Sequence, residues 1–211
     1  MERALQREAA LVDPYLALGV YEYWKSAKLN FAGGLFAGKR EQAIAALESV
    51  RQRGRYVAVD AAYSLQTIHI HEENYTQALE INDWLLQRFP QNVSALYHRG
   101  LILEKLDRVA EALTVWENVI SRIRAFIQAS DGYLAECHLH RAQLSERLPA
   151  AASAGGANER VILALQLART HARQRVAEKE LEGPLASFRE INKAIAQMVK
   201  KYDPKGEIFI N

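Results

Sequence analysis

Apolar residues along this chain recur mostly at the 3.6-residue spacing of helices, and the strict alternation of strands is almost absent. Five prolines and eleven glycines are spread over 211 residues, so breaks between apolar stretches are few. The pattern predicts an all-helical protein. One short stretch differs, because residues 207–210 (EIFI) alternate as a strand would.

The apolar stretches and their breaks predict a series of short helices joined by tight turns. Asp13-Pro14 is a cap followed by the residue favoured in a first helical turn, and Asn92 and Ser94 are candidate caps further along. The first expected helix ends at about residue 12. The others span residues 15–33, 40–53, 57–71, 75–89, 95–106, 109–128, 132–148, 159–181 and 185–201.

An alanine returns at nearly constant spacing within this series. The interval from Ala43 to Ala78 is almost equal to that from Ala78 to Ala112, and each alanine follows a short polar turn and opens an apolar stretch. A period of this length is typical of stacked helical hairpins. The sequence therefore predicts antiparallel hairpins that nest because a small side chain lets two helices approach closely.

Composition and apolar spacing divide the chain into an array and a closing element. Residues 1–148 are expected to form the stacked hairpins, and residues 149–158 are rich in alanine and glycine, as flexible linkers are. Residues 159–202 are expected to form a hairpin that caps the array, followed by a tail over residues 203–211.

Composition narrows the compartment and the partners. Basic and acidic residues nearly balance at 27 against 25, so no whole-molecule field attracts nucleic acid. A lone Cys137 rules out an intrachain disulfide, and no segment is apolar enough to span a membrane. We expect a soluble, cytoplasmic protein, or a periplasmic one if a signal peptide has been removed; the oligomeric state stays open.

The third hairpin carries residues at the positions of a known repeat phrase, and the second carries part of it. In the second, Asn82 stands where an aromatic residue is expected; in the first, Leu18-Gly19 fits, but Phe31 occupies the alanine position. The matching residues are Leu96, Arg99-Gly100, Leu103, Ala112 and Trp116 in the third hairpin, and Ala62, Leu65-Gln66, His69, Ala78 and Pro90 in the second. Over residues 40–125 the chain resembles the tetratricopeptide repeat family.

That resemblance implies a right-handed array whose first helices line a concave groove, and a groove that binds peptides or protein segments. Tyr63 and Tyr97 would anchor a partner there; the alternative is that both pack inside the protein. The family's carboxylate clamp is not reproduced by Lys105 and Lys28. The groove-lining residues implied are Tyr63, Thr67, Ile70, His71, Tyr97, Leu101, Glu104 and Lys105.

Several short patterns resemble chemical sites but lack essential parts. Residues 33–40 (GGLFAGKR) approach a phosphate-binding loop, but Arg40 replaces the magnesium-binding hydroxyl and no buried strand precedes them. Cys137 and His140 share a helix face, which gives a two-ligand fragment where zinc needs three or four. The adjacent carboxylates of Glu72 and Glu73 fall on a turn, where a solvated position is the default. We expect no metal, cofactor or catalytic residue.

A basic face on the helix at residues 159–181 is the last candidate. Glutamates are interspersed along it and no aromatic residue is available for stacking on bases, so a solvated surface is favoured over binding of RNA or acidic lipid. The basic residues are Arg160, Arg169, Arg173, Arg175 and Lys179.

Taken together, the sequence predicts a non-catalytic adaptor that binds a protein or peptide in a groove. The alternative is a helical protein that binds a small molecule or lipid in an enclosed apolar pocket. An open concave surface would favour the adaptor, and a deep enclosed cavity would favour the alternative.

Overall fold

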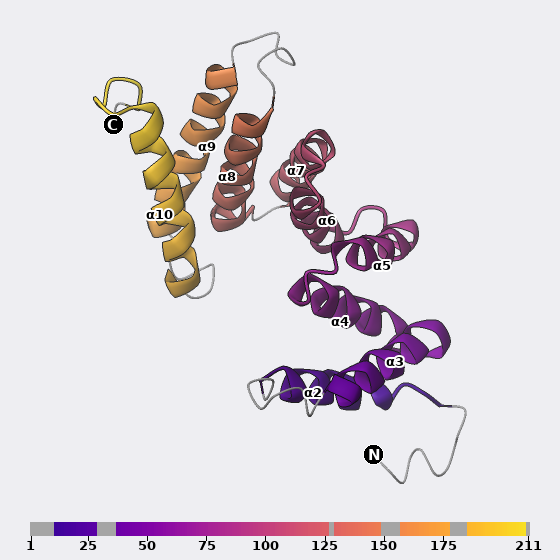
Figure 1. The fold of residues 1–211 in the computed structure, drawn as a ribbon. Helices are drawn as coiled ribbons and strands as arrows, with labels where there is room; N and C mark the ends of the chain where they lie inside the picture. Colours follow the sequence, from indigo (N-terminus) through magenta and orange to yellow (C-terminus); the bar gives the residue numbers. More distant parts are fainter. Residues whose placement is uncertain (1–10, 29–36, 127–128, 149–156, 178–184, 210–211) are drawn as a thin grey trace. The chain divides into compact units, whose positions relative to one another are not determined.

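The fold is all-helical throughout the part of the chain that the computed structural model describes, residues 11–28, 37–126, 129–148, 157–177 and 185–209 (Figure 1). The expected fold class is therefore confirmed. The helices are α2 (Tyr15–Lys28), α3 (Ala37–Arg53), α4 (Ala58–His71), α5 (Tyr75–Arg88), α6 (Val93–Lys105), α7 (Val109–Arg124), α8 (Asp131–Arg147), α9 (Ala157–Ala177) and α10 (Leu185–Tyr202).

Most helix ends lie within a few residues of the expected ones. The helix expected before residue 12 falls mostly outside the described residues, as do most of the linker and the region around Phe31. The tail that was expected from residue 203 onward forms turns and bends over residues 204–209, including the described part of the stretch with strand-like spacing.

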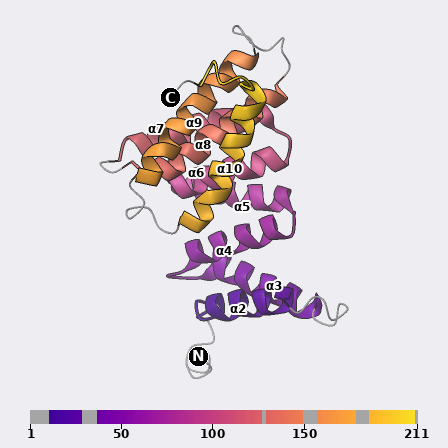
Figure 2. The same ribbon diagram turned by 90° about the vertical axis from the view of Figure 1, so that its left-hand side faces the viewer.

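The chain divides into two compact units, residues 1–90 and 91–211. In the first unit α2 packs on α3, α3 on α4 and α4 on α5. In the second, α6 packs on α7, α7 on α8 and α8 on α9, and α10 packs on both α8 and α9 (Figure 2). Each unit is thus a succession of helices in contact with their neighbours in sequence. The expected boundaries at residues 148 and 158 both fall within the second unit.

The recurring alanines are buried, with Ala43 4% exposed and Ala78 and Ala112 fully buried. Glycines face the seams in two of the hairpins. A Cβ added to Gly19 would lie 2.8 Å from Cγ of Leu47 and 3.2 Å from the carbonyl oxygen of Ala43, so α2 and α3 approach closely there. The alanine at the seam of the first hairpin is therefore Ala43.

In the third hairpin a Cβ added to Gly100 would lie 2.7 Å from Cε2 of Trp116. The second hairpin keeps this register with different residues. Gln66 precedes its alanine by the same interval as Gly100 does, and Asn82 follows its alanine by one helical turn, as Trp116 does. Gln66 and Asn82 are both fully buried. A large residue on the second helix thus packs against glycine on the first in the first and third hairpins, and the second hairpin has Asn82 and Gln66 at the equivalent positions.

The turns repeat as well as the helices. Glu73 and Asp107, which lie one repeat apart, have φ angles of 57° and 58°, in the left-handed region that non-glycine residues rarely adopt. After each of them, the next amide donates to the carbonyl five residues earlier, at 2.7 Å from Asn74 and 2.9 Å from Arg108. This closing bond is the Schellman type of helix end. The second and third hairpins therefore share a backbone turn.

Asp13 was expected to cap its own helix, but its side chain accepts hydrogen bonds from a distant part of the chain. Its carboxylate accepts the backbone N–H groups of Arg55, Tyr56 and Val57 at 3.1, 2.7 and 3.0 Å. These donors lie in the turn that leads into α4 and ends at its N-cap Val57, so Asp13 fixes the backbone at the entry to α4. The cap expected at Asn92 is confirmed, since its side chain accepts from the amide of Ala95.

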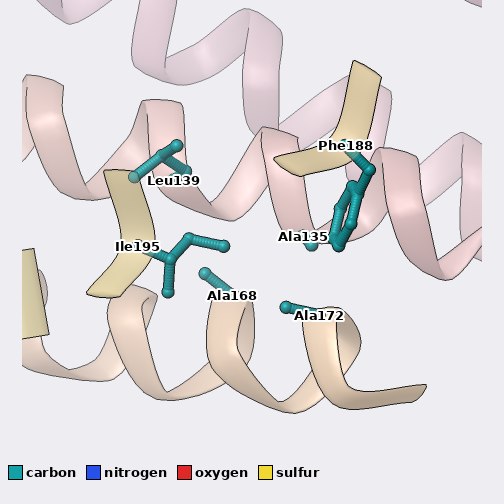
Figure 3. Packing of buried hydrophobic residues seen from close by; sticks show 6 residues of the cluster. All are labelled: Ala135, Leu139, Ala168, Ala172, Phe188 and Ile195. Atoms are coloured by element: carbon teal, nitrogen blue, oxygen red, sulfur yellow. The ribbon is translucent and has the colours of Figure 1, made fainter. Parts of the chain in front are cut away.

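The closing helices share a core with the last helix of the array (Figure 3). Small alanines on α8 and α9 face larger side chains on α10. The buried members are Ala135 and Leu139 on α8, Ala168 and Ala172 on α9, and Phe188 and Ile195 on α10. A helical hairpin that covers the apolar face of α8 is what the sequence predicted for this region.

Replacement of Gly100 by alanine should destabilise the protein by about 2 kcal/mol, because the new methyl group would overlap the rigid indole of Trp116. Gly38→Ala is the control. A Cβ at Gly38 meets nothing within 4 Å, so this change should be neutral or stabilise by up to about 1 kcal/mol. Urea denaturation measures both, and equal effects would contradict the close approach at Gly100.

Asp13→Asn should lower stability by about 1 kcal/mol near neutral pH, as loss of a capping carboxylate does. Burial raises the pKa of Asp13, but the three backbone N–H donors outweigh it and hold the pKa below its ordinary 3.8. The stabilisation that these hydrogen bonds give is therefore complete above the ordinary pKa. It is lost as pH falls through the lower pKa that Asp13 has in the folded state. Urea denaturation across this pH range should show a shallower acid loss for Asp13→Asn than for the exposed control Glu41→Gln.

Candidate functional site

The residues implied as groove-lining fall into two sets, one in each unit. Tyr63, Thr67, Ile70 and His71 lie on α4, and Tyr97, Leu101, Glu104 and Lys105 lie on α6. On α4, Thr67 is exposed, and its hydroxyl donates to its own helix at the carbonyl of Tyr63.

The end of α4 is tied to α2 and α3 by a buried tyrosine. Tyr23 is fully buried, with its hydroxyl 3.0 Å from Nδ1 of His71 and 3.1 Å from a carboxylate oxygen of Glu72. Arg40 lies 3.5 Å from the same carboxylate. Burial and the neighbouring Glu72 raise the pKa of Tyr23. The expectation that Glu72 is simply solvated is therefore wrong. His71 and Glu72 belong to a hydrogen-bonded group that joins the end of α4 to α2 in the first unit.

Glu104 has a similar structural role in the second unit. One of its carboxylate oxygens accepts from the indole Nε1 of Trp116 at 2.5 Å and lies 2.9 Å from Nδ1 of His140. The His140 ring stacks on the indole, with centroids 4.5 Å apart and planes 7° apart. Glu104 thus joins α6, α7 and α8, whereas the neighbouring Lys105 is exposed.

Tyr97 lies at a concavity of about 600 Å³ formed by α6, the end of α7 and the start of α8. Its ring makes edge contacts with Trp116 at 5.2 Å and with Tyr133 at 6.2 Å, measured between ring centroids. Phe126 and Tyr133 are 57% and 58% exposed. The lining residues are Val93, Ser94, Tyr97, His98, Ile123, Phe126, Ser130 and Tyr133.

The polar groups of this aromatic concavity are few. Burial, together with the charge and hydrogen bond of Glu136, raises the pKa of Tyr97, so its hydroxyl stays neutral. Ser130 caps α8 by accepting from the amide of Tyr133 at 3.4 Å, and Ser94 also lines the concavity. An apolar surface with hydroxyl groups along it is suited to binding an apolar side chain and its backbone.

Sequence reasoning found Tyr97 and missed Phe126 and Tyr133. A signal for Tyr133 was present, because Tyr63 and Tyr97 lie one repeat apart and Tyr133 follows at a similar interval. Phe126 has no equivalent in the other hairpins. It lies just beyond the end of α7, where the repeat period carries no information.

Cys137 and His140 lie in different surroundings. Cys137 is fully buried and burial raises the pKa of its thiol, while His140 contacts Trp116 and Glu104. Among the described residues, no group of three or more histidine, cysteine, aspartate and glutamate side chains is placed to hold a metal ion. In the same part of the chain, no helix is long and apolar enough to cross a membrane.

The basic residues expected on one face of α9 have different surroundings in the structure. Arg175 is 1% exposed, and its guanidinium lies 5.8 Å from the ring centroid of Phe188, so the expected solvated position is wrong for this residue. Arg169 donates to the carbonyl of Phe209 at 2.5 Å. Lys179 and the first half of the phosphate-loop-like stretch lie outside the described residues.

Comparison of the chain with family models, with curated proteins and with solved structures finds no significant match.

Glu104→Ala should destabilise the protein by about 2 kcal/mol, because the buried indole N–H of Trp116 would lose its acceptor. Glu104→Gln retains a carbonyl oxygen and should lose less. Lys105→Ala, at the exposed neighbouring position, should change stability by less than about 0.5 kcal/mol. Chemical denaturation followed by tryptophan fluorescence checks all three; a Glu104→Ala variant as stable as Lys105→Ala would contradict the structural role.

Proposed function

We propose that this chain is a divergent tetratricopeptide repeat protein that acts as a non-catalytic adaptor, and that it binds a protein segment in the aromatic concavity of its second unit. Support for the family comes from the repeated register of buried alanines, close-approach glycines and shared turns. Support for binding comes from the concavity itself.

The observation that carries the proposal is the exposure of two large aromatic side chains beside a half-buried third. Phe126 and Tyr133 are each more than half exposed at the concavity that Tyr97 lines. Leaving such rings in water costs free energy that a partner's apolar side chain recovers. Tyrosines are also frequent among the residues that dominate binding at protein interfaces.

The exposure of the aromatic concavity to solvent favours this proposal over binding of a small molecule or lipid in an enclosed pocket. A site built to enclose a ligand buries most of the ligand surface. Here the aromatic side chains at the rim are in contact with solvent, so an extended segment can pass across the concavity with one apolar side chain inserted. The hydroxyl groups of Ser94 and Ser130 are placed along the same concavity to meet its backbone.

Peptides selected on the full chain from a random display library should share one aromatic or large aliphatic residue. Fluorescence polarisation should show about tenfold weaker binding to Tyr133→Ala and to Phe126→Ala, as loss of an anchoring ring implies. Both positions are exposed, so the variants should keep the wild-type circular dichroism spectrum and melting temperature. Tyr97 is a poorer test, since its ring packs on Trp116.

Tyr56→Ala is the matched control, because Tyr56 is a 72% exposed tyrosine in the first unit. It should bind the selected peptides as the wild type does. Unchanged binding by Tyr133→Ala and Phe126→Ala, or loss of binding by Tyr56→Ala, would contradict the proposed site. Tight binding of a fatty acid that competes with no peptide would favour the enclosed-pocket alternative.

A further inference from the structure

A buried imidazole lies between two guanidinium groups on the α7 and α8 side of the second unit. His138 is 1% exposed. Its Nε2 lies 3.4 Å from a terminal nitrogen of Arg124, and its Nδ1 lies 3.4 Å from a terminal nitrogen of Arg141. Guanidinium nitrogens are donors only, and a neutral imidazole has a single acceptor nitrogen. In either tautomer, one of these two contacts therefore brings two donors together.

The groups around His138 carry more donors and more positive charge than they can pair internally. Nε of Arg141 is buried and has no hydrogen-bond partner among the residues that the structure describes. Another nitrogen of Arg141 lies 3.3 Å from the carboxylate of Glu117, whose side chain is 61% exposed. Among the carboxylates of the described residues, the exposed Glu117 is thus the one seen to balance the charge of Arg141.

From α9 the ring of His171 stacks parallel to His138, with centroids 5.7 Å apart, and Nδ1 of His171 lies 2.6 Å from the carboxylate of Asp131. Burial, followed by the charges of Arg141, His171 and Arg124, lowers the pKa of His138 to about 3. The imidazole is therefore neutral at physiological pH, and the local potential that it experiences is positive.

His138, Arg124, Arg141 and Glu117 line an open pocket of about 340 Å³, to which α7 also contributes Ile120 and Ser121 and α9 contributes Leu167. The missing component is a group that brings several acceptors and negative charge. A phosphate group has both, and its oxygens match the planar fork of a guanidinium. The hydroxyl-bearing Ser121 lines the same cavity.

We propose that this cavity binds a phosphate group, held between Arg124 and Arg141, with the N–H of His138 as a further donor. The phosphate supplies acceptors for the N–H groups of His138 and of the two arginines. The Glu117 side chain turns toward solvent as the phosphate binds. Free phosphate and a phosphomonoester share this chemistry. The site is separate from the aromatic concavity, because the two sets of lining residues have no member in common.

The test is titration of the full chain with inorganic phosphate and with O-phosphoserine, followed by amide NMR shifts at constant ionic strength. One or both should give a saturable change at residues of the cavity, while serine gives none. Binding should also raise the pKa of the His138 imidazole, because the negative charge of the bound phosphate offsets the positive charges of the two arginines. Binding of phosphoserine alone identifies a phosphomonoester as the ligand, and equal binding of both identifies free phosphate as sufficient.

Arg124→Gln and Arg141→Gln should each weaken phosphate binding about tenfold. Arg124 is exposed, so its variant should fold normally even if Arg141→Gln is less stable. Arg122→Gln is the control; Arg122 lies on the same helix, and its Nε donates to Asn118. The proposal is overturned by the absence of saturable shifts with both phosphates, or by Arg124→Gln binding as tightly as Arg122→Gln.

Discussion

The close approach of two helices at the seams of the first and third hairpins is the constraint on which the rest of this structure depends. Two helices can come this near only where a small residue on one leaves room for a large residue on the other. Gly19 faces Leu47, and Gly100 faces Trp116, at distances that leave no space for a Cβ atom. The buried alanines lie one turn before these large residues and extend the same seam. These contacts thereby determine the register of the two helices in a hairpin as well as the distance between them.

The seam of the third hairpin also determines what surrounds it in the second unit. Trp116 is buried against Gly100, and its indole N–H then needs the acceptor that Glu104 provides. The same carboxylate holds His140 on α8, and the same indole supports the edge of Tyr97. Tyr97 in turn contacts Tyr133, whose exposed ring forms the rim of the aromatic concavity. A packing requirement in the core thus positions the surface that we propose binds a partner.

Sequence reasoning recovered the fold because its signals are local. Apolar spacing, turn residues and one repeated alanine are properties of neighbouring residues, and they placed most helices within a few residues of their bounds. Contacts between distant segments carried no such signal. Asp13 was read as the cap of its own helix because nothing nearby reveals that the amides of residues 55–57 come to lie against it. Arg175 was read as exposed because helical spacing does not show that α10 covers it. Phe126, beyond a helix end, follows no period at all.

The second hairpin offers the most direct measurement of the central claim, because it keeps the register with Gln66 and Asn82 in place of glycine and tryptophan. A double-mutant cycle on Gln66→Gly and Asn82→Trp, measured by chemical denaturation, isolates the coupling between the two positions. If pairing of small with large residues determines the seam, Asn82→Trp alone should be strongly destabilising and Gln66→Gly should rescue it by at least about 1 kcal/mol. Additive effects of the two substitutions would show that these positions do not share a seam and would contradict the account.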